Sequence, residues 1–145
     1  STVSSLLRSL PPVVRGCYPM TTRQIGLAGY DHRLRAFKEG IADGHGAAYN
    51  AAIWSECRSF VPRFLVEARA RAGVAADLFC DAIDVYTSVC GNLEQLSSIF
   101  PLSGSKDMMN ARMVDQSDDA ISLLEHAREM ESEGVGILQQ IKRAL

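Results

Sequence analysis

Four cysteines and three histidines carry the most reactive side chains of this 145-residue chain. Structural zinc sites usually contain CxxC pairs at a regular spacing, and these cysteines form no such pair. Three of them fall on or beside apolar stripes of predicted helices, where a free thiol behaves as a small core hydrophobe. We therefore expect buried, reduced thiols in a cytoplasmic protein. The cysteines are Cys17, Cys57, Cys80 and Cys90.

The histidines His32, His45 and His126 lie on, or at the edge of, three different predicted helices. Imidazoles from separate helices can converge on one metal ion. A di-iron bundle would also need Glu-x-x-His on two helices, and the sequence has no such motif. We expect no cofactor, and a metal-dependent helical-bundle enzyme that uses these three histidines stays open as an alternative.

Motifs for nucleophilic catalysis and phosphate binding are missing from the sequence. It has no Gly-x-Ser-x-Gly elbow, no Gly-x4-Gly-Lys loop and no Rossmann glycine fingerprint. Cys17 lies in a predicted connector and is the best placed of the four thiols to act as a nucleophile, but no histidine is predicted to activate it. The sequence therefore predicts no catalytic residue, and an enzymatic function is the less favoured reading.

A second alternative is a small-molecule site inside the predicted bundle. Aromatic side chains in a helix usually fill a core, but an amide between apolar positions must find partners if it is buried. Asn50 is such an amide, and it would orient a ligand in a polar and aromatic pocket. The predicted lining is Tyr30, Tyr49, Asn50, Trp54 and Tyr86.

Apolar residues recur every three or four positions along every long segment, which is the period of an amphipathic helix. In the third predicted helix, this stripe is Tyr49, Ile53, Cys57, Phe60, Phe64 and Ala68. Predicted helices span residues 1–10, 21–41, 46–73, 75–99 and 106–145, and whether the last one bends or breaks near 115–117 is left open. Pro62 predicts a kink in the third helix, because proline lacks an amide hydrogen.

These segments predict an all-α fold, a four-helix bundle of up-down type with a short extra N-terminal helix. The chain is one domain, in which residues 1–20 form the short helix and a connector and residues 21–145 form the bundle. Two helices also carry charged residues, which we expect on solvated outer faces. The charged residues are Arg58, Arg63, Arg69 and Arg71 in the third helix, and Glu125, Glu129, Glu131 and Glu133 in the last.

The charge balance bears on the partners of the domain. The 15 basic and 17 acidic residues give a net charge of −2, which argues against nucleic acid as a partner. No apolar run approaches the roughly 20 residues of a membrane span, so we expect no membrane partner.

The spacing of several residues resembles the helical C-terminal region of bacterial proteins whose N-terminal half resembles papain-like cysteine peptidases and the butirosin acyltransferase BtrH. The resemblance covers about residues 25–145 and departs from the family pattern at Leu34, where tryptophan is expected. It implies an accessory helical domain, and no catalytic residue is carried over, because the family's cysteine and histidine are expected in the N-terminal half. It depends on Gly29, Tyr30, Asp31, Ala48, Tyr49, Asn50, Ala51, Glu56, Arg58, Phe64, Leu65, Glu67, Ala68, Tyr86, Leu93, Leu96, Phe100 and Pro101.

We therefore expect a non-catalytic helical domain that binds a protein partner or forms a homodimer, in a role accessory to a cysteine-peptidase-like domain. The small-molecule site and the three-histidine metal site are the two alternatives to this hypothesis.

Overall fold

A computed structural model describes residues 26–145 as five helices, with no strand within this range. The helices are α3 (Leu27–Lys38), α4 (Gly44–Ala72), α5 (Ala76–Ile99), α6 (Lys106–Asp115) and α7 (Ser117–Ala144). The predicted helix over residues 1–10, the connector to residue 20 and the predicted helix start at Thr21 lie outside the described residues.

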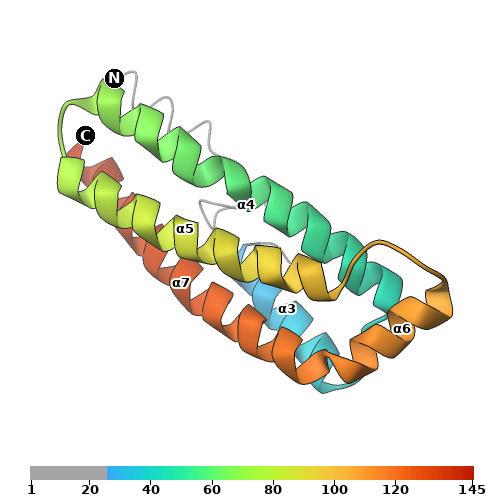
Figure 1. The fold of residues 1–145 in the computed structure, drawn as a ribbon. Helices are drawn as coiled ribbons and strands as arrows, with labels where there is room; N and C mark the ends of the chain where they lie inside the picture. Colours follow the sequence, from blue (N-terminus) through green and yellow to red (C-terminus); the bar gives the residue numbers. More distant parts are fainter. Residues whose placement is uncertain (1–25) are drawn as a thin grey trace.

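The helices α3, α4, α5 and α7 alternate in direction and form the predicted up-down four-helix bundle (Figure 1). Helix α5 packs on both α4 and α7, and α3 packs on α7. The short α6 links α5 to α7 and packs on α4 at one end of the bundle. The all-α prediction is therefore confirmed, with α3 much shorter than the three helices that it accompanies.

Helix α4 begins and ends at the signals that the sequence carries. The Asp43 carboxylate accepts a hydrogen bond from the Gly46 amide at 2.7 Å, which caps the helix start. Gly73 ends the helix in the left-handed conformation, with φ of 67°, which glycine adopts without steric cost. The helix runs through Pro62 without interruption.

The last predicted helix breaks within residues 115–117, between α6 and α7. The Ser105 hydroxyl caps α6 by accepting from the Met108 amide. At Gln116 the backbone leaves the helical conformation, with φ of −105° and ψ of 11°, and α7 starts at Ser117. This break turns the chain from the bundle end into the long α7, which returns along α5.

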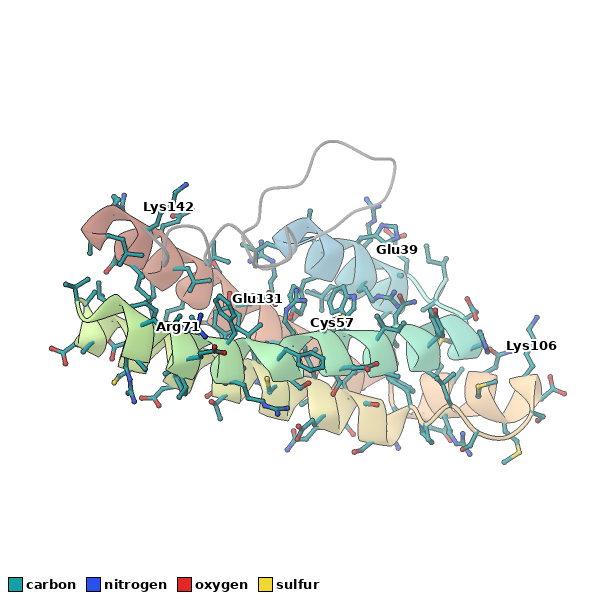
Figure 2. All side chains as sticks on the ribbon, turned by 90° about the horizontal axis from the view of Figure 1, so that it is seen from above. Glu39, Cys57, Arg71, Lys106, Glu131 and Lys142 are labelled. Atoms are coloured by element: carbon teal, nitrogen blue, oxygen red, sulfur yellow. The ribbon has the colours of Figure 1, made fainter. Side chains whose placement is uncertain are left out.

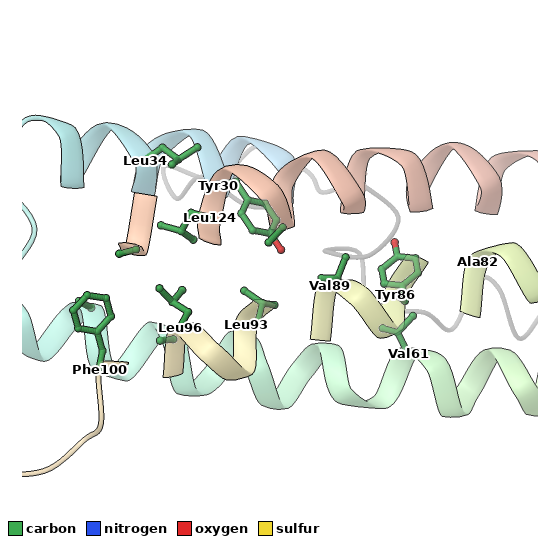
Figure 3. Packing of buried hydrophobic residues seen from close by; sticks show 14 of the residues in the cluster. Tyr30, Leu34, Val61, Ala82, Tyr86, Val89, Leu93, Leu96, Phe100 and Leu124 are labelled. Carbon is green, nitrogen blue, oxygen red and sulfur yellow. The ribbon is translucent and has the colours of Figure 1, made fainter. Parts of the chain in front are cut away.

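The apolar faces of α5 and α7 match the sequence prediction closely. For residues 75–100 the helical period predicts an inward face of Leu78, Ala82, Val85, Val89, Leu93, Leu96 and Phe100, and all of these except Leu78 are buried. In α7 the buried residues include Ala120, Leu124, Ala127, Leu138 and Ile141. Figure 3 shows the α5 side chains packed between α4 and α7.

The predicted inward face of α4 is wrong. Of its six residues only Ala68 is buried, while Phe64 is half-buried and the other four are exposed. A neighbouring face that is rich in glycine and alanine is buried instead, because small side chains let the adjacent helices approach α4 closely. This face is made of Gly44, Ala47, Ala48, Ala51, Arg58, Val61, Leu65 and Ala68.

Two further expectations about burial are corrected. Cys57 and Cys80 are exposed and Cys90 is half-buried, so the thiols are not core residues as a group. The apolar period of the second predicted helix, Leu27, Tyr30, Leu34, Phe37 and Ile41, predicts that Ile41 is buried. Ile41 is instead exposed in the turn between α3 and α4, because α3 already ends at Lys38.

Candidate functional site

A buried ion pair joins α4 to α7 across the centre of the bundle. The Arg58 Nε donates to the Glu131 Oε1 at 2.8 Å, and the side chains are only 2% and 1% exposed. Two tyrosines from the other two helices complete the group. We call Tyr30, Arg58, Tyr86 and Glu131 the polar layer, to which each of the four bundle helices contributes one residue.

Hydrogen bonds join three of the four residues of the polar layer. The Tyr30 hydroxyl donates to Glu131 Oε2 at 2.5 Å, so both carboxylate oxygens of Glu131 accept a bond. The Tyr86 hydroxyl is buried and has no hydrogen-bond partner among residues 26–145. Figure 3 shows the hydroxyls of Tyr30 and Tyr86 directed into the interior of the bundle. A buried, unpaired hydroxyl is a cost to stability.

The layer also explains a glycine in the middle of α7. A Cβ atom built on Gly134 would lie 2.7 Å from Cε2 of Tyr86, which is closer than side-chain atoms pack. Gly134 therefore makes room for the Tyr86 ring. The nearby Gly136 meets no such neighbour, since nothing lies within 4 Å of its added Cβ.

Burial and charge fix the protonation of the layer. Burial raises the pKa of the Tyr30 hydroxyl, and the charge of Glu131 raises it further. The same two causes raise the pKa of Tyr86. Burial by itself lowers the pKa of the Arg58 guanidinium, but Glu131 more than offsets this and the pKa ends above its usual value. Near neutral pH the layer thus holds a charged arginine and two protonated phenols.

Sequence reasoning missed Arg58 and Glu131, because charged residues were assigned to solvated outer faces. Their positions nevertheless follow the core period. Glu131 is four residues after the buried Ala127, and Arg58 is three residues before the buried Val61. A charged residue in register with a core stripe was the available signal.

The five residues of the predicted pocket are divided between the interior and the surface. Tyr30 and Trp54 touch edge to face, with ring centroids 4.7 Å apart, and Tyr86 is buried nearby in the polar layer. Tyr49 instead lies half exposed beside His45, and the Asn50 amide donates to the Gly46 carbonyl one turn earlier.

The space beside the interior members of this set is small. A cavity bordered by Trp54, Asn50 and Phe37 measures about 10 Å³, which is about the room that one water molecule needs. A larger hollow of about 230 Å³ lies open at the surface between α3 and the start of α4, where it reaches Asn50 and His32.

The three histidines lie apart on the surface. His32 is exposed on α3, His45 at the start of α4 and His126 on α7. Within residues 26–145, no three His, Cys, Asp or Glu side chains are grouped so that they could hold a metal ion. The structure therefore does not bring these histidines together.

A contiguous apolar strip runs along the outside of α4. We call Tyr49, Ile53, Cys57 and Phe60 the outer stripe; steps of four, four and three residues keep them on one side of the helix. Tyr49 is 50% exposed, Ile53 38% and Phe60 57%, and Cys57 is exposed as well. Figure 2 shows Cys57 on α4 in the view from above the bundle.

The outer stripe stays uncovered by α3 because α3 is fixed to α7. Arg128 of α7 donates two hydrogen bonds to the Asp31 carboxylate of α3, and Lys38 pairs with Glu125 at 2.9 Å. The buried residues Tyr30, Leu34 and Phe37 also anchor α3 in the core, and α3 packs on α7.

Among the described helices, none is both long and apolar enough to cross a membrane. Comparison of the chain with protein-family models, with curated protein sequences and with solved structures finds no match.

Proposed function

We propose that this chain is a helical interaction domain that docks on a protein partner through the outer stripe of α4. The observation that carries the proposal is the exposure of two aromatic residues and an isoleucine, in register, on one side of a 29-residue helix. Exposed apolar patches of this kind mark interaction surfaces, and aromatic residues are enriched at the centre of such surfaces.

The rest of the structure supports a scaffold role. The interior is packed, and its polar layer is sealed from solvent, so the layer serves the pairing of the four helices. Polar groups buried between helices can specify one register among several, because a shifted register would leave them unpaired. A fixed register in turn keeps the outer stripe of α4 in a defined orientation.

A partner suited to the outer stripe is an amphipathic helix, whose own apolar residues recur every three or four positions. The resemblance to the helical region of cysteine-peptidase-like proteins adds an accessory role to this proposal, in which the domain assembles with or covers a catalytic domain.

The proposal is tested by photo-crosslinking from the stripe itself. The photoreactive amino acid benzoylphenylalanine replaces Phe60 in the protein expressed in its own cell, and the adducts are identified by mass spectrometry. The matched control places the same group at Val66, which is on α4 and 47% exposed but lies about a third of a turn away around the helix.

Adducts with a protein at Phe60 that are absent at Val66 support the proposal, whether the captured chain is a different protein or another copy of this one. Equal labelling from both positions, or no adduct from either, overturns it.

A further inference from the structure

The residue types of the outer stripe follow the same order from either end. It runs from an aromatic residue through two smaller apolar residues to a second aromatic residue, Tyr49, Ile53, Cys57 and Phe60, and its midpoint lies near Ser55. A surface that meets an identical copy across a two-fold axis must be complementary to itself. We infer that the partner of this stripe is a second copy of the chain, an inference that rests on the proposed function.

The two copies of α4 would lie antiparallel, crossing near Ser55. In that arrangement Ile53 of one protomer faces Cys57 of its partner, and Tyr49 comes next to Phe60. Farther from the two-fold axis, Gly46 lies on the same side of α4 and comes opposite Phe64 of the partner protomer. Because glycine has no side chain, there is room for the Phe64 ring. At the Ile53–Cys57 and Gly46–Phe64 pairs a larger residue meets a smaller one, which lets two helices approach to about 8–10 Å between axes.

The helix dipoles favour the antiparallel orientation, whereas one pair of like charges at the contact weakens the dimer. Antiparallel helices place the positive end of one helix dipole beside the negative end of the other. At the rim of the contact, Glu56 lies one position from the two-fold axis and is exposed. The two copies of Glu56 therefore approach each other, which makes the dimer weak and dependent on ionic strength.

The first experiment measures mass against concentration. Sedimentation equilibrium of the purified chain from about 1 to about 500 μM, a range that brackets a micromolar Kd, should show the mass rising from 15.8 kDa toward twice that value. Phe60→Glu should weaken the dimer by roughly tenfold or more, because the substitution occurs twice in a symmetric contact. Val66→Glu, on another side of α4, should leave the dimer unchanged.

A constant mass of 15.8 kDa at all concentrations overturns the inference, as does equal weakening by Phe60→Glu and Val66→Glu. Circular dichroism of both variants establishes that they are folded, which is expected because both positions are exposed.

The second experiment tests the antiparallel register. With a rise of 1.5 Å per residue and helices 8–10 Å apart, the two Cys57 Cα atoms would lie roughly 10 Å from each other. In a variant with Cys17 and Cys80 replaced by serine, a short bismaleimide should join two chains through Cys57. Cys90 is half-buried and burial raises the pKa of its thiol, so it reacts slowly.

The control for this cross-link is the same variant with Cys57→Ser as well. A cross-linked dimer that survives this change, or none in the Cys57 variant, overturns the register. If the chain stays monomeric while photo-crosslinking from Phe60 captures a different protein, the second-copy inference fails and the proposed function stands. If neither a dimer nor an adduct forms, both fail.

Discussion

Arg58 and Glu131 meet across the centre of the bundle, 73 positions apart in the chain, with 2.8 Å between Nε and Oε1. Neither side chain reaches solvent, so each charge depends on the other. Removal of one member leaves the other charge buried and unpaired, which costs far more than the net contribution of the pair.

Glu131→Gln should therefore lower the free energy of unfolding by about 3–5 kcal/mol. The triple variant Arg58→Met/Glu131→Leu/Tyr30→Phe should recover most of that loss, because it removes both charges and also the Tyr30 hydroxyl, which would otherwise be left buried without its acceptor. Urea denaturation measures both effects. The control is Arg128→Ala, which breaks the exposed pair with Asp31 and should cost less than about 1 kcal/mol. Equal losses at Glu131 and Arg128 would contradict the burial of the central pair.

The two tyrosines of the polar layer should respond in opposite ways to loss of the hydroxyl. Tyr30→Phe removes a hydrogen bond to a carboxylate and should lower the free energy of unfolding by about 1.5–3 kcal/mol. Tyr86→Phe removes a buried hydroxyl with no partner among the described residues, so it should leave stability unchanged or raise it by up to about 1 kcal/mol. Thermal and urea unfolding of the two variants, measured together, check the order. A large loss at Tyr86 would reveal a hydrogen bond from its hydroxyl.

Two glycines of α7 offer a matched pair of substitutions. Gly134→Ala puts a methyl group 2.7 Å from the Tyr86 ring and should destabilise the protein by about 1–3 kcal/mol. Gly136→Ala meets nothing within 4 Å and should stabilise the protein by about 0.5–1 kcal/mol, since alanine is the better helix former. The melting temperatures should thus move in opposite directions. If both rise, the Tyr86 ring does not lie against Gly134.

The burial of the tyrosines also sets how stability depends on pH. An unfolded tyrosine loses its proton near pH 10, whereas Tyr30 and Tyr86 keep theirs in the folded protein because burial raises both pKa values. Their contribution is complete below about pH 10 and is lost as the pH rises further, by up to about 1.4 kcal/mol per pH unit for each tyrosine.

This dependence is measured as the free energy of unfolding between about pH 8 and pH 11. Compared with the wild-type protein, Tyr30→Phe and Tyr86→Phe should each reduce the alkaline slope, because both phenols are buried. The raised pKa of the Cys90 thiol affects all variants equally and cancels in the comparison. Identical slopes in the wild-type protein and in both variants would contradict the burial of the two phenols.

The bundle itself was predictable because α5 and α7 each carry one apolar stripe, so periodicity determines which side is buried. Helix α4 has two candidate faces, one with large apolar residues and one rich in alanine. The residues of both faces recur every three or four positions, so periodicity does not distinguish them. Hydrophobicity favours the face that is in fact exposed, since Phe60 is more apolar than Ala51. The choice is made by the close approach of neighbouring helices, which a single sequence does not reveal.

The interior position of two of the four polar-layer residues was predictable from the sequence. Tyr30 and Tyr86 were predicted to line a pocket inside the bundle, and both are buried. Arg58 and Glu131 were assigned to the surface, because charged residues are almost never fully buried unless they are paired. Their pairing joins α4 to α7, and no local pattern connects positions that far apart.

The last prediction concerns Glu56, which separates the second-copy arrangement from other uses of the outer stripe. In the antiparallel dimer the two Glu56 side chains approach each other at the rim, so Glu56→Gln should remove a like-charge repulsion and tighten the dimer by about twofold to fivefold, the size of a weak surface charge interaction. Higher ionic strength should tighten the wild-type dimer and leave the variant nearly unaffected, because salt screens only the charged pair.

Sedimentation equilibrium at low and high salt measures both effects. Glu39→Gln, at an exposed position just after α3, is the charge-matched control and should change neither. A dimer that weakens with Glu56→Gln would place Glu56 beside a positive charge instead, and the two-fold axis would then lie elsewhere on α4.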